Sequence, residues 1–206
     1  VDIGNWIFYR ATESLAEWRK KYNPELKVSV NTSPVQYVDN ECVVEDWFKH
    51  MDKLGLPHDC LIVEITEGLL LNLNDVVLNK LEAFRNEGVQ IALDDFGTGY
   101  SSLSYLQEIH SDFLKIDRSF VNNIMYDDKT RALCHEIIKI AHIYDTEVIA
   151  EGIETIEQSK LLNDSGCDFG QGYLYSKPVS AKEFEALLEQ QHQPAKKQLS
   201  NQVSTH

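Results

Sequence analysis

The sequence lacks closely spaced cysteines. Its four cysteines, Cys42, Cys60, Cys134 and Cys167, form no C-x-x-C pair, so neither a zinc site nor a disulfide framework is indicated. It also lacks an apolar run approaching the roughly 20 residues of a membrane-spanning helix, and its N-terminus lacks the pattern of a signal peptide. We therefore expect a cytoplasmic protein with reduced thiols and no membrane contact of its own. A parent protein anchored in a membrane further upstream stays compatible with the sequence.

Positive charge is also scarce. The 19 basic and 33 acidic side chains give a formal net charge of -14. A field of this sign repels nucleic-acid backbones and anionic membranes, so we expect no DNA or RNA partner. A phosphate-containing ligand would need divalent cations to offset the local charge. The composition, with 43% hydrophobic and 25% charged residues, is typical of a compact globular domain.

Short β-rich runs alternate with helical periodicity along the chain. We predict strands at 27–31, 61–66, 89–95, 113–117, 147–151 and 169–175. We predict helices at 4–21, 40–54, 73–87, 101–107, 128–144, 155–165 and 181–189. Residues 190–206 contain few apolar side chains and are expected to form a flexible C-terminal tail. This alternation predicts an α/β fold with a parallel sheet, either open and doubly wound or closed into a barrel.

One polar residue comes late in each predicted strand. These residues are Asn31, Glu64, Asp94, Lys115, Glu151 and Gln171. Because side chains alternate across a strand, the polar set points away from the apolar set and converges on one centre. Such convergence at the carboxyl ends of the strands favours a (βα)8 barrel over an open sheet. A barrel needs eight strands. Since the chain begins on a helical pattern, we expect about two N-terminal strands to be missing from it.

The stretch Asp94-Asp95 places two carboxylates side by side at the end of an apolar run. A single aspartate there would most simply cap a helix or shape a turn. Two adjacent carboxylates repel each other unless a cation lies between them, so the pair indicates a metal or a buried lysine. The following Gly97 and Gly99 allow a tight bend beside such a site, and the pattern is not the G-x-G-x-x-G of dinucleotide-binding proteins.

The polar set suits a particular chemistry. Asn31, Glu64, Asp94 and Asp95 offer only oxygen ligands, which Mg²⁺ and Mn²⁺ prefer. Two such ions about 4 Å apart would hold the attacking and leaving oxygens of an in-line displacement at phosphorus. Within the same set, Lys115 would supply a fixed positive charge for phosphate or hydroxide, and Glu151 would orient or deprotonate the attacking water.

Each of these residues also has a purely structural interpretation. Asn31 and Gln171 are compatible with satisfying backbone groups at strand ends, and Lys115 with a structural ion pair. Glu67 and Asp117 are interpreted either as helix N-terminal charges or as residues that support the site. The functional interpretation depends on the whole set, because six polar residues in one phase at the same strand end are improbable as coincidence.

Six stretches together resemble the EAL domain, a bacterial phosphodiesterase module that acts on cyclic di-GMP. They are "VSVNTSPVQ", "VEITEG", "ALDDFGTGYSSLSYL", "LKIDRSFV", "VIAEGIET" and "GQGYLYSKPVS", within residues 4–189. The resemblance implies a modified (βα)8 barrel that uses two Mg²⁺ or Mn²⁺ ions, and no organic cofactor, to open cyclic di-GMP to linear pGpG. It implies direct metal ligation by Asn31, Glu64 and Asp94, with Asp95 serving the second ion.

The same resemblance implies that Lys115 and Glu151 position and activate the water, with Gln171 nearby, and that Glu67 anchors the DFGTGYSS loop. The Glu-x-Leu motif that names the family is expected upstream of residue 1. Residues 1–189 are therefore interpreted as an EAL domain that is incomplete at its N-terminus. Relatives commonly follow a sensory or GGDEF domain and pair through the barrel, so we expect such upstream domains and a homodimer.

Two other functions stay open. The first is a catalytically inactive EAL domain that acts as a cyclic di-GMP receptor or regulatory module; the retention of Glu64, Asp94, Asp95 and Glu151 argues against it. The second is a barrel aldolase with Lys115 as a Schiff-base nucleophile, which requires a lowered lysine pKa. Four surrounding carboxylates would have the opposite effect on that pKa, so hydrolysis is the preferred interpretation.

Overall fold

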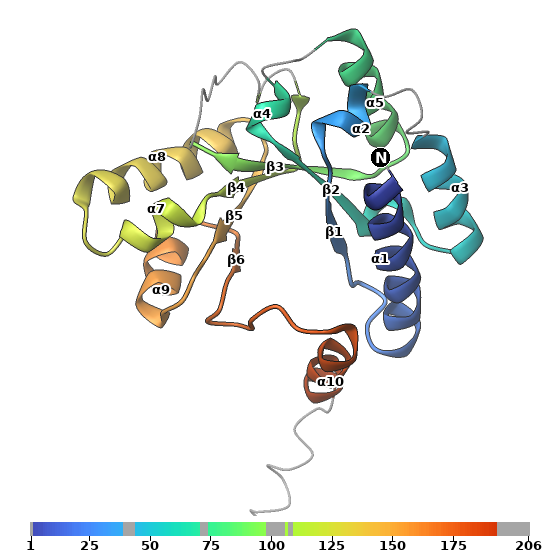
Figure 1. The fold of residues 1–206 in the computed structure, drawn as a ribbon. Helices are drawn as coiled ribbons and strands as arrows, with labels where there is room; N and C mark the ends of the chain where they lie inside the picture. The colour runs from blue at the N-terminus through green and yellow to red at the C-terminus, as the bar shows by residue number, and fades with distance from the viewer. Residues whose placement is uncertain (1, 39–43, 71–73, 98–105, 107–108, 193–206) are drawn as a thin grey trace, which may run out of the picture.

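The computed structural model of the chain describes residues 2–38, 44–70, 74–97, 106 and 109–192 (Figure 1). Its strands are β1 (Val28–Asn31), β2 (Leu61–Thr66), β3 (Gln90–Phe96), β4 (Phe113–Ile116), β5 (Glu147–Glu151) and β6 (Phe169–Gln171). Its helices are α1 (Asp2–Lys21), α2 (Pro34–Val38), α3 (Val44–Leu54), η1 (His58–Cys60), α4 (Glu67–Leu70), α5 (Asp75–Asn86), α7 (Arg118–Asn123), α8 (Asp128–Ile143), α9 (Ile156–Asp164) and α10 (Ala181–His192). Most of the helix predicted at 101–107, except residue 106, lies outside the described residues, as do residues 40–43 and the predicted tail beyond 192. No helix of the described part is both long and apolar enough to cross a bilayer.

The six strands form one parallel sheet in the order β1-β2-β3-β4-β5-β6. Each strand therefore lies beside its neighbour in the sequence, and the strand order does not reverse as it does in a doubly wound sheet. The predicted α/β class and the barrel-type arrangement are confirmed, with the sheet forming a half-barrel. Figure 1 shows α1, α3 and α5 on one flank of the curved sheet and α7, α8 and α9 on the other.

The last predicted strand is shorter than the sequence suggested. The prediction was 169–175, but β6 ends at Gln171. The chain turns at Gly172, whose carbonyl accepts hydrogen bonds from the amides of Tyr175 and Ser176. An alanine at 172 would place its Cβ 2.2 Å from the carbonyl oxygen of Ile153, so this close approach needs glycine. Local apolar alternation in "YLY" does not reveal a contact of this kind.

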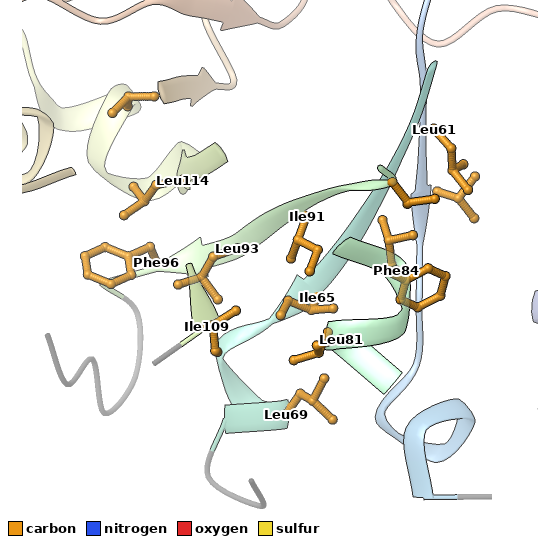
Figure 2. Packing of buried hydrophobic residues seen from close by; sticks show 14 of the residues in the cluster. Leu61, Ile65, Leu69, Leu81, Phe84, Ile91, Leu93, Phe96, Ile109 and Leu114 are labelled. Atoms are coloured by element: carbon orange, nitrogen blue, oxygen red, sulfur yellow. The ribbon is translucent and has the colours of Figure 1, made fainter. Parts of the chain in front are cut away.

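The outer face of the sheet carries the main hydrophobic core. Apolar residues of the strands point outward and pack under the helices (Figure 2). Ile65 of β2 and Ile91 of β3 are fully buried there, facing Leu81 and Phe84 of α5. This is the face predicted from strand alternation.

Aromatic packing joins three helices to this core. Trp47 of α3 is 2% exposed and stacks on Phe8 of α1, with ring centroids 4.1 Å apart and an interplanar angle of 4°. The same indole lies against Phe84 of α5 and donates a hydrogen bond from Nε1 to Oδ1 of Asn5. Trp47 is thus the point at which α1, α3 and α5 meet.

The inner face of the sheet is layered. Ile62, Ala92 and Phe113 form a small apolar cluster with Ile149 packed against it. Two residues further along each of these four strands, on the same face, stand charged side chains: Glu64, Asp94, Lys115 and Glu151. Because side chains two residues apart share a face, the apolar cluster, here called the apolar floor, lies beneath a layer of charged side chains. The charged layer is at the carboxyl ends of the strands, where barrel enzymes carry their active sites.

Candidate active site

Lys115 lies at the centre of the charged layer. Its Nζ is 2.6 Å from a carboxylate oxygen of Glu64, 2.7 Å from one of Glu151 and 3.2 Å from one of Asp94. The lysine side chain is only 4% exposed. Four of the six predicted convergent residues are therefore brought together by β2, β3, β4 and β5. The structural ion pair that the sequence left open for Lys115 is present as well.

The electrostatics of this cluster follow from burial and charge. Burial alone would lower the pKa of Lys115, but hydrogen bonds to Glu151 and Glu64 and the charges of both outweigh it and raise that pKa above its ordinary value. Burial, supported by the charges of Asp94 and Glu64, raises the pKa of Glu151 despite the neighbouring ammonium. A protonated lysine is not a nucleophile, so the Schiff-base aldolase loses its chemical basis.

A β-bulge lies at the two adjacent aspartates. Leu93 pairs with Leu114, but the next pair is Phe96 with Ile116, so β3 carries one residue more than β4 across this interval. Asp95 has a positive φ of 58°, which a non-glycine residue adopts only at a special turn or bulge. The sequence predicted that Asp95 lies where the strand gives way to a loop. β3 ends one residue later, at Phe96, and the register shift falls between Leu93 and Phe96.

The surroundings of Asp95 are acidic. Burial is the largest cause that raises its pKa, and the charges of Asp94 and Asp117 raise it further. The backbone amide of Asp95 donates to Oδ1 of Asp94 at 2.9 Å. Excess negative charge therefore extends from the Lys115 cluster to the end of β3.

The turn after Glu151 depends on glycine. Gly152 has a φ of +72°, and a Cβ added there would lie 2.5 Å from Cβ of Arg118 at the start of α7. Gly55, with a φ of +70°, has a comparable conformation but no atom within 4 Å of an added Cβ. The backbone that carries Glu151 is thus fixed by a close approach as well as by its conformation.

This contrast predicts a difference between two glycine variants. Gly55→Ala should cost about 1–2 kcal/mol of unfolding free energy, because alanine is strained at positive φ. Gly152→Ala should cost more than Gly55→Ala and should also disturb Glu151, because Arg118 must move. Urea unfolding of the two variants measures both costs. Equal costs would contradict a role for the Arg118 contact.

The remaining predicted residues occupy different places. Asn31, at the exposed end of β1, is the register partner of Glu64, and exposed Gln171 of β6 is the register partner of Glu151. They flank the cluster from the two edges of the sheet. Glu67 begins α4 and is 5% exposed, and neither carboxylate oxygen has a hydrogen-bond partner in the described part of the chain. The DFGTGYSS loop that it was expected to anchor lies largely outside the described residues.

Asp117 has a clear structural task. It is the N-cap of α7, and its side chain accepts a hydrogen bond from the amide of Ser119 at 2.9 Å. Burial would raise its pKa, but the hydrogen bonds with Ser119 outweigh burial and lower it. The helix-terminal interpretation of Asp117 is therefore confirmed, and its charge also acts on Asp95.

The sequence analysis did not single out Thr66. This residue ends β2, is half-buried and is the register partner of Asp94. It lies two positions after Glu64, so strand alternation alone places it on the inner face. The signal was present, but a lone threonine at a strand end has no distinctive chemistry.

The donor set suits a hard divalent cation. Its side chains are carboxylates and an amide, whose oxygens Mg²⁺ and Mn²⁺ prefer. Glu64, Asp94, Asp95 and Glu151 contribute four negative charges when ionised, against one positive charge from Lys115, so negative charge remains to be offset. Within the described residues, no three Asp, Glu, His or Cys side chains are already grouped as a metal cluster. The oxygen donors fit Mg²⁺ or Mn²⁺, and the ammonium group of Lys115 lies among the same carboxylates.

Comparison with known proteins decides the family. The family model described as "EAL domain" matches residues 1–178. The chain belongs to the EAL domain family. It is 34% identical over 185 residues to the cyclic di-GMP phosphodiesterase PdeR of Escherichia coli, covering 90% of the chain and 28% of PdeR. It is 33% identical over 188 residues to the bifunctional diguanylate cyclase/cyclic di-GMP phosphodiesterase MucR of Pseudomonas aeruginosa, covering 91% of the chain and 27% of MucR.

Solved structures of the EAL family share the fold. The cAMP- and cyclic-di-GMP-bound form of the EAL enzyme Bd1971 matches with a TM-score of 0.86 and 37% identity, covering 91% of this chain and 52% of that one. The cyclic-di-GMP complex of the PaMucR phosphodiesterase has a TM-score of 0.83 and 33% sequence identity, and the match covers 89% of this chain and 74% of that one. A manganese and cyclic-di-GMP complex of Klebsiella pneumoniae BlrP1 has a TM-score of 0.74 and 27% sequence identity, and the match covers 83% of this chain and 43% of that one. The chain spans about a quarter of the curated relatives that it matches, 27% and 24% of the first two.

Proposed function

We propose that this EAL domain hydrolyses cyclic di-GMP to linear pGpG in bacterial second-messenger signalling, with Mg²⁺ or Mn²⁺ as its metal. The observation that supports this most is the buried cluster in which Glu64, Asp94 and Glu151 surround Lys115 on the inner face. Relatives named as cyclic di-GMP phosphodiesterases, and a relative's complex with manganese and cyclic di-GMP, support the substrate and the metal.

The proposed roles follow from position and charge. Asn31, Glu64, Asp94 and Asp95 would hold the two ions, which when bound polarise the phosphodiester and lower the pKa of water. Glu151 accepts a proton from the attacking water, and burial favours this by raising its pKa.

As the water oxygen bonds to phosphorus, one ribose oxygen leaves and takes a proton, so a single phosphodiester opens. Lys115 supplies a positive charge where negative charge develops. Gln171 lies beside Glu151 in the sheet register and is suited to contact the substrate.

The proposed function predicts metal-dependent turnover. The protein incubated with cyclic di-GMP and Mn²⁺ should form pGpG. EDTA should abolish this turnover, because Lys115 offsets only one carboxylate charge and does not replace the metal that polarises the phosphodiester. Chromatographic detection of pGpG measures this. The chain and a longer natural protein that contains it should both be assayed; no pGpG from either under metal-replete conditions would reject the proposal.

A receptor is the second candidate, because family members bind cyclic di-GMP in complexes such as that of PaMucR. Calorimetry with cyclic di-GMP and Ca²⁺ should be compared with turnover in Mn²⁺. Binding without turnover favours the receptor, and both together favour the hydrolase.

We also propose how the domain is arranged in its protein. The domain would extend over residues 1–189, since α10 contacts α1 and the residue that follows it. Glu185 accepts a hydrogen bond from Trp18 Nε1 at 3.3 Å, and Glu189 accepts one from the hydroxyl of Tyr22, just after α1, at 3.1 Å. We propose that it works as a homodimer in a parent protein with sensory or GGDEF domains. MucR, a relative named as bifunctional, supports the latter. Light scattering of the protein measures the oligomeric state.

A further inference from the structure

The ammonium group of Lys115 is surrounded by carboxylate oxygens. A lysine ammonium has three N–H donors and no acceptor. Three carboxylate oxygens, one each from Glu64, Glu151 and Asp94, lie within 3.2 Å of Nζ. Three oxygens of the protein therefore surround the ammonium group, and one of them, from Glu64, accepts a hydrogen bond from it at 2.6 Å. In this arrangement these oxygens occupy the space in which Lys115 would contact a water molecule or a phosphate oxygen.

Two of these three oxygens belong to proposed metal ligands. A divalent ion held by Glu64 and Asp94 would lie near the oxygens that now face the ammonium, and two cations at one set of oxygens repel each other. These groups are well protected from solvent, because the side chains of Lys115 and Glu64 are only 4% and 6% exposed. Water therefore screens little of that repulsion.

We propose that Lys115 is an internal counter-ion that occupies the carboxylate cluster when metal is absent and is displaced from Glu64 and Asp94 when metal binds. The inference rests on the metal dependence of the proposed function. Displacement would free N–H groups of Lys115 for the substrate while Glu151 keeps its contact. One side chain would thereby preserve the unloaded site and become available for catalysis only in the loaded site.

The first test is metal affinity. Lys115→Met removes the competing charge and keeps much of the side-chain volume. Its affinity for Mn²⁺, measured by calorimetry without substrate, should rise at least about 10-fold over the wild type, because metal no longer displaces a cation. Lys27→Met is the matched control: Lys27 lies just before β1, with Nζ 2.7 Å from Oε1 of Gln90, and its loss should leave Mn²⁺ affinity unchanged.

Thermal unfolding gives a second readout. Without metal, Lys115→Met should unfold on the order of 5–10 °C below the wild type, since its buried carboxylates lose their counter-ion. Saturating Mn²⁺ should raise its melting temperature by more than it raises that of the wild type.

A wild-type measurement covers the case in which the variant does not fold. With lysine labelled by ¹³C and ¹⁵N, NMR should show a slowly exchanging Nζ group without metal, and its signal should shift and its exchange should accelerate on addition of Mg²⁺. An unchanged signal at Mg²⁺ saturation would overturn the inference, as would equal or weaker Mn²⁺ binding by Lys115→Met. Absence of metal binding by the wild type would instead overturn the metal-dependent function together with the inference.

Discussion

Replacing Glu151 by glutamine is expected to lower the rate of cyclic di-GMP hydrolysis by about 10²–10⁴-fold, the usual contribution of a general base. Glutamine keeps the shape of the side chain but accepts no proton from water. The half-buried Glu151 lies 2.7 Å from Lys115, at the carboxyl end of β5. The measurement is the rate of pGpG formation at saturating substrate and Mn²⁺, together with the dissociation constant of cyclic di-GMP in Ca²⁺.

The same strand offers a matched control. Glu147 begins β5 four residues earlier, on the same face, and lines an open hollow of about 530 Å³ beside the apolar floor. Glu147→Gln makes the same chemical change at the opposite end of the strand and should keep the wild-type rate. Comparable losses in the two variants would indicate a general effect on the domain and would contradict the assignment of Glu151 as base.

Trp47→Ala should lower the free energy of unfolding by about 3–5 kcal/mol, the cost of removing a large aromatic side chain from a packed core. For a chain of 206 residues this corresponds to a fall in melting temperature of about 10 °C. The variant loses the stacking on Phe8, the contact with Phe84 and the hydrogen bond to Asn5. Urea unfolding followed by circular dichroism measures the change.

Trp6→Ala is the control for that experiment. Trp6 also belongs to the α1 region but is 63% exposed, so its truncation should change stability by no more than about 0.5 kcal/mol. A loss at Trp6 as large as that at Trp47 would mean that the outer surface of α1 is covered in solution. It would contradict the assignment of Trp47 as the main link between α1, α3 and α5.

The strands and the converging polar residues were predictable because strand alternation is a local property. Glu64, Asp94, Lys115 and Glu151 each follow an apolar residue by two positions, and this period is visible without knowing which strands are neighbours. The capping box at Thr155 and Gln158 is likewise a local feature, because its Thr-x-x-Gln spacing is visible within four residues of sequence.

Other features depend on pairs of elements and were missed. The bulge at Asp95 arises from a mismatch between β3 and β4, which neither strand reveals alone. The end of β6 is set by the contact of Gly172 with Ile153. The helices α2 and α4, of five and four residues, are too short for helical periodicity to mark them.

The surplus residue in β3 has a consequence for how such a domain changes over generations. Deletion of Asp94 or Asp95 would remove the extra residue of β3, so that β3 and β4 would have equal numbers of residues between the paired positions. We therefore expect the sheet to tolerate this deletion. The same deletion would remove one carboxylate from the proposed metal ligands. An in-frame deletion at this point would therefore weaken the proposed metal site while leaving the fold in place.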